Sequence, residues 1–296
     1  MARRFKTLSE IQSLPGYVEH FDTIVREQEP RFLGDYDFEK FIHCALRGNH
    51  VHGNGFVVEF NDNGVMRVVA IGNICGRKLF GIEGWDAAHS VFMEQVTRRQ
   101  LLESLAQQLS ELPAKLEAIE KLIICPGGAN WLDAAVSSLS TVCCQSTLRA
   151  LYFRADHRQD EITEARERDD NDMRLGFNRR SEFATDVVAR FVGLNALARP
   201  SPRVILVERL RDLLRPYLTA SAESLVDDAT TRRHFQRLIR GYKGQLQTAE
   251  QRLADAALFF TTENLQLIAY LSTNLGERRR LTQVRWNPRT GRVEAP

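Results

Sequence analysis

The sequence predicts a helix-rich α+β protein, in which an N-terminal α/β part precedes a helix-rich C-terminal half. Three observations predict it: an alternating β-hairpin pattern over Gly55–Ile71, leucines at helical spacing in Asp86–Leu112, and a long polar helical pattern over Ala222–Ala256. The chain has 296 residues, 43% of them hydrophobic and 26% charged, so it can form a substantial core.

The N-terminal part begins with short helices, predicted at Ser9–Leu14, Val18–Glu27 and Phe38–Leu46, the last of them after an acidic start. The hairpin that follows turns at residues 61–64, which end in Asn-Gly. That dipeptide favours the positive φ angles of a tight hairpin turn. A third strand is expected at Arg77–Ile82.

A strand–turn–helix–strand crossover is predicted next. An apolar segment at residues 122–125 precedes Pro126-Gly127-Gly128, a helix from Trp131 to Leu139, and a second apolar segment at Leu148–Phe153. The glycine turn partly resembles the Pro-Gly-Gly loop of nucleotide-processing proteins of the lysine-decarboxylase-like family, which implies phosphate binding. A tight strand–helix connection is the alternative.

The second half is predicted to be mainly helical, with helices at Glu182–Ala198, Val204–Leu214 and Ala222–Ala256. A strand is expected to open at Leu258, and Gln283–Glu294 carries a second hairpin pattern.

We expect the chain to divide into an N-terminal α/β part, residues 1–145, and a helix-rich part, residues 146–296. A single domain is the alternative, because the predicted strand Leu148–Phe153 can equally belong to the first sheet.

The charge balance and the cysteines limit the class of protein. The 40 basic and 38 acidic residues leave a formal charge of +2, which does not indicate a nucleic-acid partner. No run of 18 apolar residues predicts a membrane span, and Thr7–Pro15 is too polar for a signal peptide. Five cysteines without framework spacing favour reduced thiols. We therefore expect a cytoplasmic protein, although export by a specialised system would leave no such signal.

Several potential metal ligands lie close together in the sequence. Imidazole and thiolate groups bind zinc, but the spacing here matches no common structural zinc pattern, so no metal site is predicted. The alternative places His43 and Cys44 on the Phe38–Leu46 helix, and His50 and His52 in the loop before the hairpin. The residues are His43, Cys44, His50, His52 and, further on, Cys75.

Residues 151–162 contain the series Phe153-Arg154-Ala155-Asp156-His157-Arg158. It resembles the opening motif of ADP-ribosyltransferase toxins of the Arg–Ser–Glu class, which is aliphatic–aromatic–Arg–x–Asp–x–Arg. The resemblance implies that Arg154 projects from a strand and binds the pyrophosphate of NAD through its planar fork of donors. The prolines that follow this motif in the family are absent, and Gln159 stands in their place.

Two later segments are similar to the other motifs of that family. Residues 217–221, Tyr-Leu-Thr-Ala-Ser, imply that Thr219 and Ser221 shape the nicotinamide pocket. Residues 261–263, Thr-Thr-Glu, keep the last acid, and the resemblance implies that Glu263 stabilises an oxocarbenium-like sugar. Thr261 replaces the family's earlier acid, which puts arginine modification in doubt and affects NAD hydrolysis less.

Two functions of different classes therefore stay open. The first is an NAD-dependent ADP-ribosyltransferase or NAD glycohydrolase with NAD as substrate, including a translocated effector that modifies a protein target. The second is a non-catalytic structural, assembly or adaptor protein that uses its long helices as contact surfaces for a protein partner or for a second copy of the chain.

Overall fold

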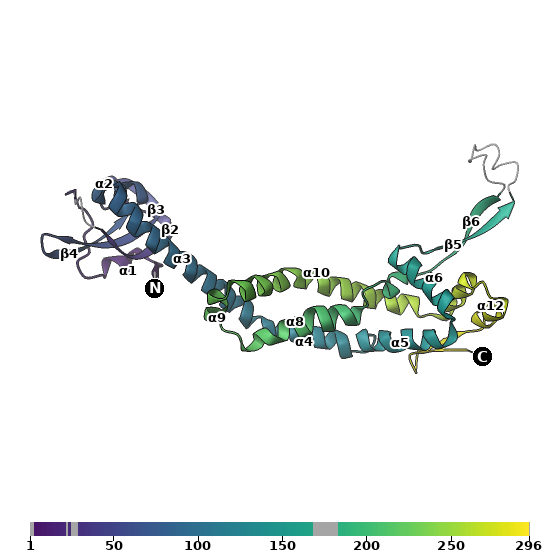
Figure 1. Ribbon diagram of the computed structural model, residues 1–296. Coiled ribbons are helices and arrows are strands. Elements are labelled where there is room, and N and C mark those ends of the chain that lie inside the picture. Colours follow the sequence, from purple (N-terminus) through teal and green to yellow (C-terminus); the bar gives the residue numbers. More distant parts are fainter. Residues whose placement is uncertain (1–2, 22, 25–28, 168–182, 296) are drawn as a thin grey trace. The chain divides into compact units, whose positions relative to one another are not determined.

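The computed structural model describes residues 3–21, 23–24, 29–167 and 183–295 (Figure 1). The predicted α+β class is confirmed: a mixed four-stranded sheet precedes long helices. The chain forms two compact units. Unit 1 comprises residues 1–107 and 222–227, and unit 2 comprises residues 108–221 and 228–296. The division expected between residues 145 and 146 falls inside unit 2.

Unit 1 is built on a sheet of order β1-β2-β3-β4. The strands are β1 (Arg3–Phe5), β2 (Arg31–Cys44), β3 (Arg47–Asp62) and β4 (Val65–Ile71). β1 pairs with β2 in parallel, and the other pairs are antiparallel. The predicted hairpin is confirmed, with Asn63 and Gly64 at φ angles of 49° and 89° in its turn.

Three predictions for unit 1 were wrong. Residues 38–44 continue β2 rather than forming a helix, and their side chains alternate, with Ile42 and Cys44 buried and Phe41 exposed. Residues 73–80 form helix α2 (Asn73–Phe80) in place of most of the expected third strand. The described residues of Val18–Glu27 are not helical, and residues 22 and 25–27 lie outside the described residues.

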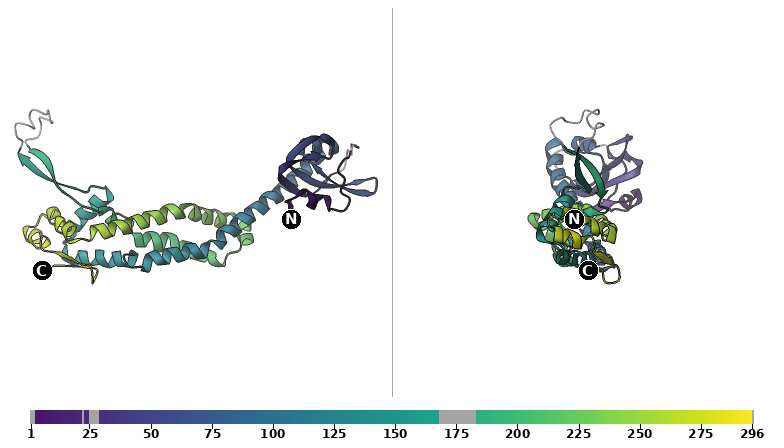
Figure 2. Two further views of the ribbon diagram at one scale, coloured as in Figure 1. Left: turned by 180° about the vertical axis from the view of Figure 1, so that it is seen from behind. Right: turned by 90° about the vertical axis from the view of Figure 1, so that its right-hand side faces the viewer.

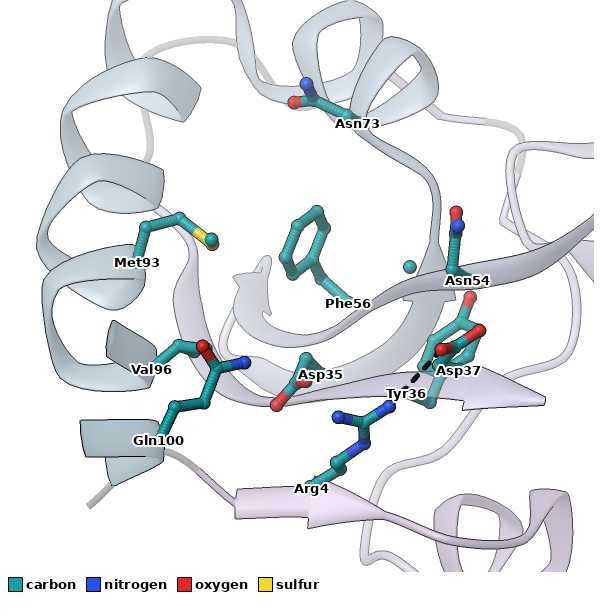
Figure 3. Close-up of a pocket in the computed structure, with 11 residues that line it drawn as sticks. Arg4, Asp35, Tyr36, Asp37, Asn54, Phe56, Asn73, Met93, Val96 and Gln100 are labelled. Atoms are coloured by element: carbon teal, nitrogen blue, oxygen red, sulfur yellow. Dashed lines mark hydrogen bonds and ion pairs between the residues drawn. The ribbon is translucent and has the colours of Figure 1, made fainter. Parts of the chain in front are cut away.

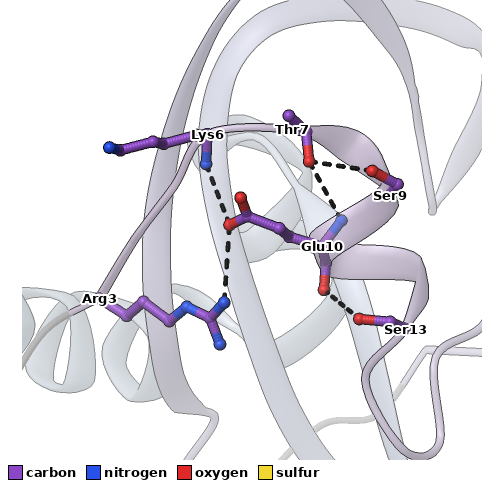
Figure 4. A network of polar contacts seen from close by, with 6 residues as sticks. All are labelled: Arg3, Lys6, Thr7, Ser9, Glu10 and Ser13. Carbon is purple, nitrogen blue, oxygen red and sulfur yellow. Dashed lines mark hydrogen bonds and ion pairs between the residues drawn. The ribbon is translucent and has the colours of Figure 1, made fainter.

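Helix α1 (Leu8–Gln12) precedes β2 in the chain, and helix α3 (Ile82–Ser110) follows α2. Helix α3 confirms the predicted long helix. Thr7 caps α1: its hydroxyl accepts a hydrogen bond from the Glu10 amide at 3.3 Å (Figure 4). The Glu10 carboxylate accepts from the Lys6 amide and pairs with Arg3 at 3.5 Å. These contacts fix the start of α1, which buries Ile11 completely.

Both faces of the sheet are covered, because successive apolar side chains of β3 and β4 point to opposite faces. Val57 and Val68 belong to one buried cluster with Phe5, Ile11 and Tyr36. The opposite cluster surrounds Trp85 of α3, which is fully buried, and the indole N–H donates to Asn73 Oδ1 at 2.6 Å. An apolar strand pair with both faces buried gives unit 1 a core of its own.

Unit 2 is mainly helical. The long helix α10 (Ala229–Phe259) lies beside η2 (Val204–Arg211), a π-helix that in turn lies beside α4 (Leu112–Ile124) (Figure 1). The other elements are α5 (Ala129–Val142), α6 (Gln145–Asp156), η1 (Leu194–Leu197), α8 (Asp212–Leu214), η3 (Arg215–Thr219), α11 (Thr262–Leu267), η4 (Ile268–Leu271) and α12 (Leu275–Leu281). The short helix α9 (Ala222–Asp227) is assigned to unit 1.

Two small hairpins complete unit 2. Strands β5 (Glu161–Glu167) and β6 (Phe183–Arg190) form a two-stranded sheet that projects from the helices (Figure 2). Their register shifts between Ile162 and Thr163, so β6 carries an extra residue there. The second pair, β7 (Arg285–Asn287) and β8 (Arg292–Glu294), confirms the predicted tail hairpin.

The predicted crossover was wrong, because both of its strands are helical. Residues 122–124 end α4, in which Ile119 and Ile123 are buried one turn apart. Leu148–Phe153 lies within α6, whose buried residues Thr147, Leu151 and Ala155 recur every four positions. A short apolar run fits a buried strand and one face of a helix equally well.

Other predictions for unit 2 divide between right and wrong. Val204–Leu214 is helical, and the long helix is present, split into α9 and α10 at Asp228. In contrast, the described part of Glu182–Ala198 forms β6 and η1, and Leu258 lies inside α10. No helix among the described residues is both long and apolar enough to cross a membrane.

Gly76 is required by the position of Trp85, since a Cβ atom at residue 76 would lie 2.3 Å from the indole ring. We expect Gly76→Ala to lower the free energy of unfolding by about 1–3 kcal/mol through overpacking, measured by denaturant unfolding. Gly241→Ala is the control, because its nearest neighbour is a flexible glutamine side chain at 3.5 Å. Equal stability of the Gly76 variant and the wild type would contradict this packing argument.

Candidate functional site

The Arg154 segment lies on helix α6 and the turn that ends it, not on the strand that the resemblance implies. The Arg154 guanidinium donates to the carbonyl oxygen of Glu161 at 2.6 Å and more weakly to that of Gln159 at 3.5 Å. Asp156 accepts a hydrogen bond from the Arg199 amide at 2.7 Å. These side chains therefore fasten the exit of α6, and the Nη1 atom of Arg154 is engaged by backbone carbonyls.

The remaining predicted site residues lie on other elements of unit 2. Thr219 ends η3, and its hydroxyl donates to the carbonyl of Pro216 at 3.5 Å. Ser221 is exposed in the segment after η3, and Glu263 is exposed in the first turn of α11. Within the described part of the chain, no hydrogen bond or ion pair joins Arg154, Thr219 and Glu263 to one another.

Unit 1 contains a cavity of about 360 Å³ between the sheet, the start of α2 and one side of α3 (Figure 3). Its charged side chains are paired: Arg4 with Asp37 at 3.3 Å, and Asp35 with Arg99 of α3 at 2.9 Å. The lining contains no histidine, cysteine or serine, and both of its carboxylates, Asp35 and Asp37, are engaged in these ion pairs. The remaining lining residues are Tyr36, Asn54, Gly55, Phe56, Asn73, Met93, Val96 and Gln100.

Three of the potential metal ligands of the N-terminal part lie together, because the Cys44 thiol has side-chain hydrogen bonds with His52 and Cys75. His43 and His50 are exposed, whereas Cys44 and Cys75 are buried. His52 uses its Nδ1 atom in a hydrogen bond with the Tyr36 hydroxyl at 3.0 Å. Among the residues that the structure describes, no group of three or more histidine, cysteine or carboxylate side chains could hold a metal ion.

A buried carboxylate joins three elements of unit 2. Glu277 of α12 is 7% exposed and accepts hydrogen bonds from the Cys144 thiol at 2.8 Å, the Thr147 hydroxyl at 2.9 Å and the Ser272 hydroxyl at 2.6 Å. Burial alone would raise the pKa of Glu277, but these hydrogen bonds outweigh it and lower the pKa to about 2. The Glu277 carboxylate therefore stays ionised and holds the start of α6 against α12.

Helix α10 of unit 2 has an asymmetric distribution of charge. Asp228 caps it by accepting hydrogen bonds from the amides of Thr230 and Thr231 at 2.9 and 3.1 Å. Its apolar side packs into unit 2 and includes Phe235 and Phe259, both fully buried. At 3.6 residues per turn, the opposite side carries four exposed cations, which we call the basic face: Arg233, Arg237, Arg240 and Lys243.

The basic face is not neutralised within the chain. Residues 229–249 contain four arginines and one lysine but no aspartate or glutamate. In the described part of the chain, none of the four basic-face residues forms an ion pair. The formal charge of +2 for the whole chain therefore conceals a strongly positive surface, because acidic residues elsewhere balance it.

Around the basic face, the exposed side of α10 is polar or bare, and its exposed Leu258 lies further along, near the end of the helix. Gln236 and Gln247 lie among the cations, and two glycines, Gly241 and Gly244, lie within the helix, which continues through both of them although an interruption was expected there. A Cβ atom at residue 244 would meet no atom within 4 Å, so no packing within the chain requires a glycine there. Glycine in a helix interior costs about 1 kcal/mol relative to alanine. The exposed side of α10 thus combines positive charge with unobstructed backbone.

Neither a family model nor a curated protein nor a solved structure matches this chain.

The Glu277 cluster predicts a pH dependence of stability. Because the pKa is lowered from 4.5 to about 2, its stabilising contribution is complete above pH 4.5 and is lost as the pH falls toward 2. We expect Glu277→Gln to lower the free energy of unfolding at pH 7 by about 2 kcal/mol. When the pH is lowered toward 2, the free energy of unfolding of this variant should fall by less than that of the wild type. Exposed Glu263→Gln is the control, and an equal loss in both variants would contradict the cluster's role.

The resemblance to ADP-ribosyltransferases leads to a second test. Because Arg154 donates to two backbone carbonyls, we expect Arg154→Ala to lower the melting temperature equally with and without millimolar NAD. An NAD-dependent rise in melting temperature that Arg154→Ala abolishes would instead support the transferase, because only a ligand of the folded state stabilises it. Nicotinamide release by the wild type and by Glu263→Gln is the matching activity measurement.

Proposed function

We propose that the chain is a non-catalytic adaptor or assembly protein that binds an anionic partner through the basic face of α10. The observation that carries this proposal is the row Arg233, Arg237, Arg240 and Lys243, which is exposed, lies opposite the buried side of the helix and has no acidic partner among the described residues. Long helices used as contact surfaces are the interaction class that the sequence leaves open.

Some arginines elsewhere in unit 2 are neutralised by carboxylates, and others, such as Arg279 and Arg289, form no ion pair among the described residues. Arg166 pairs with Asp186 at 2.5 Å, and Arg190 pairs with Glu161 at 2.6 Å. On α10, by contrast, successive cations lie three or four residues apart, where like charges destabilise a helix by about 0.2–0.5 kcal/mol per pair. A partner of opposite charge would turn this repulsion into attraction.

The transferase interpretation stays a prediction. The Arg154 segment forms the C-terminal end of α6 and the turn after it. The NAD titration described above tests the transferase interpretation independently of α10. A protein partner and a homo-oligomer are both compatible with an adaptor, and an acidic surface on either would satisfy the same four cations.

The proposal is tested with fluorescent heparin, a sulfated polyanion that reports on the positive surface alone. We expect the triple variant Arg233→Gln, Arg237→Gln, Arg240→Gln to bind roughly 100-fold more weakly than the wild type, from about 1 kcal/mol per cation near an anionic surface.

The matched control removes the same charge from exposed arginines outside the basic face, in the triple variant Arg279→Gln, Arg289→Gln, Arg292→Gln. It should bind heparin nearly as the wild type does. Equal weakening in both triple variants would show that net charge alone governs binding, and the proposal would fail. Unfolding curves of both variants confirm that they are folded.

A further inference from the structure

We infer that the anionic partner of the basic face is the phosphate backbone of a nucleic acid, bound without regard to base sequence. This inference rests on the proposed function and names the partner of the same surface. It draws on three features of α10: the kind of cation, the absence of apolar side chains from the basic face itself, and the bare backbone at Gly244.

The cations are those suited to phosphate. Three of the four basic-face residues are arginines, whose planar guanidinium donates two parallel hydrogen bonds to phosphate oxygens. From Arg233 to Lys243 the helix rises about 15 Å, at 1.5 Å per residue. A DNA strand places one phosphate about every 3.4 Å along its axis, so this row can meet several phosphates of one duplex.

The polar remainder of the surface fits the same partner. Gln236 and Gln247 can donate to phosphate and sugar oxygens, contacts that position a protein on nucleic acid without reading sequence. The open space beside Gly244 lets a phosphate group approach the helix backbone closely. This close approach gives the glycine a role that packing within the chain does not supply.

An acidic protein or a lipid surface fits less well. Protein interfaces have a core of aromatic and other apolar side chains, and the basic face contains none. An amphipathic helix binds a bilayer through its apolar side, but on α10 that side is buried, with Phe235 and Phe259 fully covered. Phosphodiester backbone requires charge and hydrogen bonds only, which is what this surface presents.

The test uses fluorescence anisotropy with labelled DNA duplexes of two unrelated sequences, over roughly 50 to 200 mM salt. We expect similar affinity for both sequences, and a slope of log K against log salt of about −3 to −4, from four phosphate contacts. Arg237→Gln and Arg240→Gln should each reduce the slope by about one, whereas Arg289→Gln should not change it. Single-stranded RNA of the same length serves as a second probe.

Gly244→Ala provides a readout that a purely structural role would not change. Alanine should raise the melting temperature because it favours the helix, yet weaken duplex binding severalfold because its methyl group obstructs the phosphate. Unchanged affinity would overturn the close approach at this position.

The outcomes separate this inference from the proposed function. Heparin binding that depends on the basic face, without binding to DNA or RNA, would overturn the nucleic-acid inference and leave the adaptor in place. Tighter binding to polyglutamate or to vesicles containing phosphatidylserine would also overturn it, in favour of an acidic protein or a membrane. If the wild type binds none of these polyanions, both the nucleic-acid inference and the proposed adaptor function are overturned.

Discussion

The burial of one side of α10 is the constraint on which the rest of unit 2 depends. Phe235 and Phe259 fix the rotation of the helix about its axis, so its polar residues have to face outward. The C-terminal half is tied further to η1, where Asn195 donates to Asp255 at 2.7 Å and Gly193 lies directly against the helix backbone. The N-terminal half, which carries the cations, is held through Phe235 and its capping residue Asp228.

The elements that could be predicted from sequence are those with a distinctive local pattern. Asn63-Gly64 identified a hairpin, and leucine spacing identified α3. The failures share one cause: short apolar runs such as residues 122–125 carry no period, and packing decides their conformation. In residues 38–44, Ile42 and Cys44 alternate with exposed residues, but an acidic start suggested a helix. The basic face can be seen in the sequence as cations spaced three or four residues apart. The formal charge of +2 for the whole chain conceals it, because acidic residues elsewhere balance these cations.

The Arg154 segment shows how backbone conformation decides what a motif can do. On a strand that borders a cleft, an arginine fork is available to a pyrophosphate; at the end of α6, the same fork meets the carbonyls of Gln159 and Glu161. Glu277, which has no motif around it, makes more contacts than Glu263, because several elements converge on it in space.

The projecting β5–β6 ribbon has a consequence for how the molecule behaves at high concentration. A two-stranded ribbon has two open edges, and such edges can template the growth of fibrils. Here the β5 edge is lined by Glu161, Glu164 and Arg166, and β6 is distorted by its extra residue near Val188. An added strand would have to cover those charges or straighten that distortion. These charges and this distortion oppose edge-to-edge pairing, whereas the exposed Phe183, Val187 and Val188 of β6 favour it.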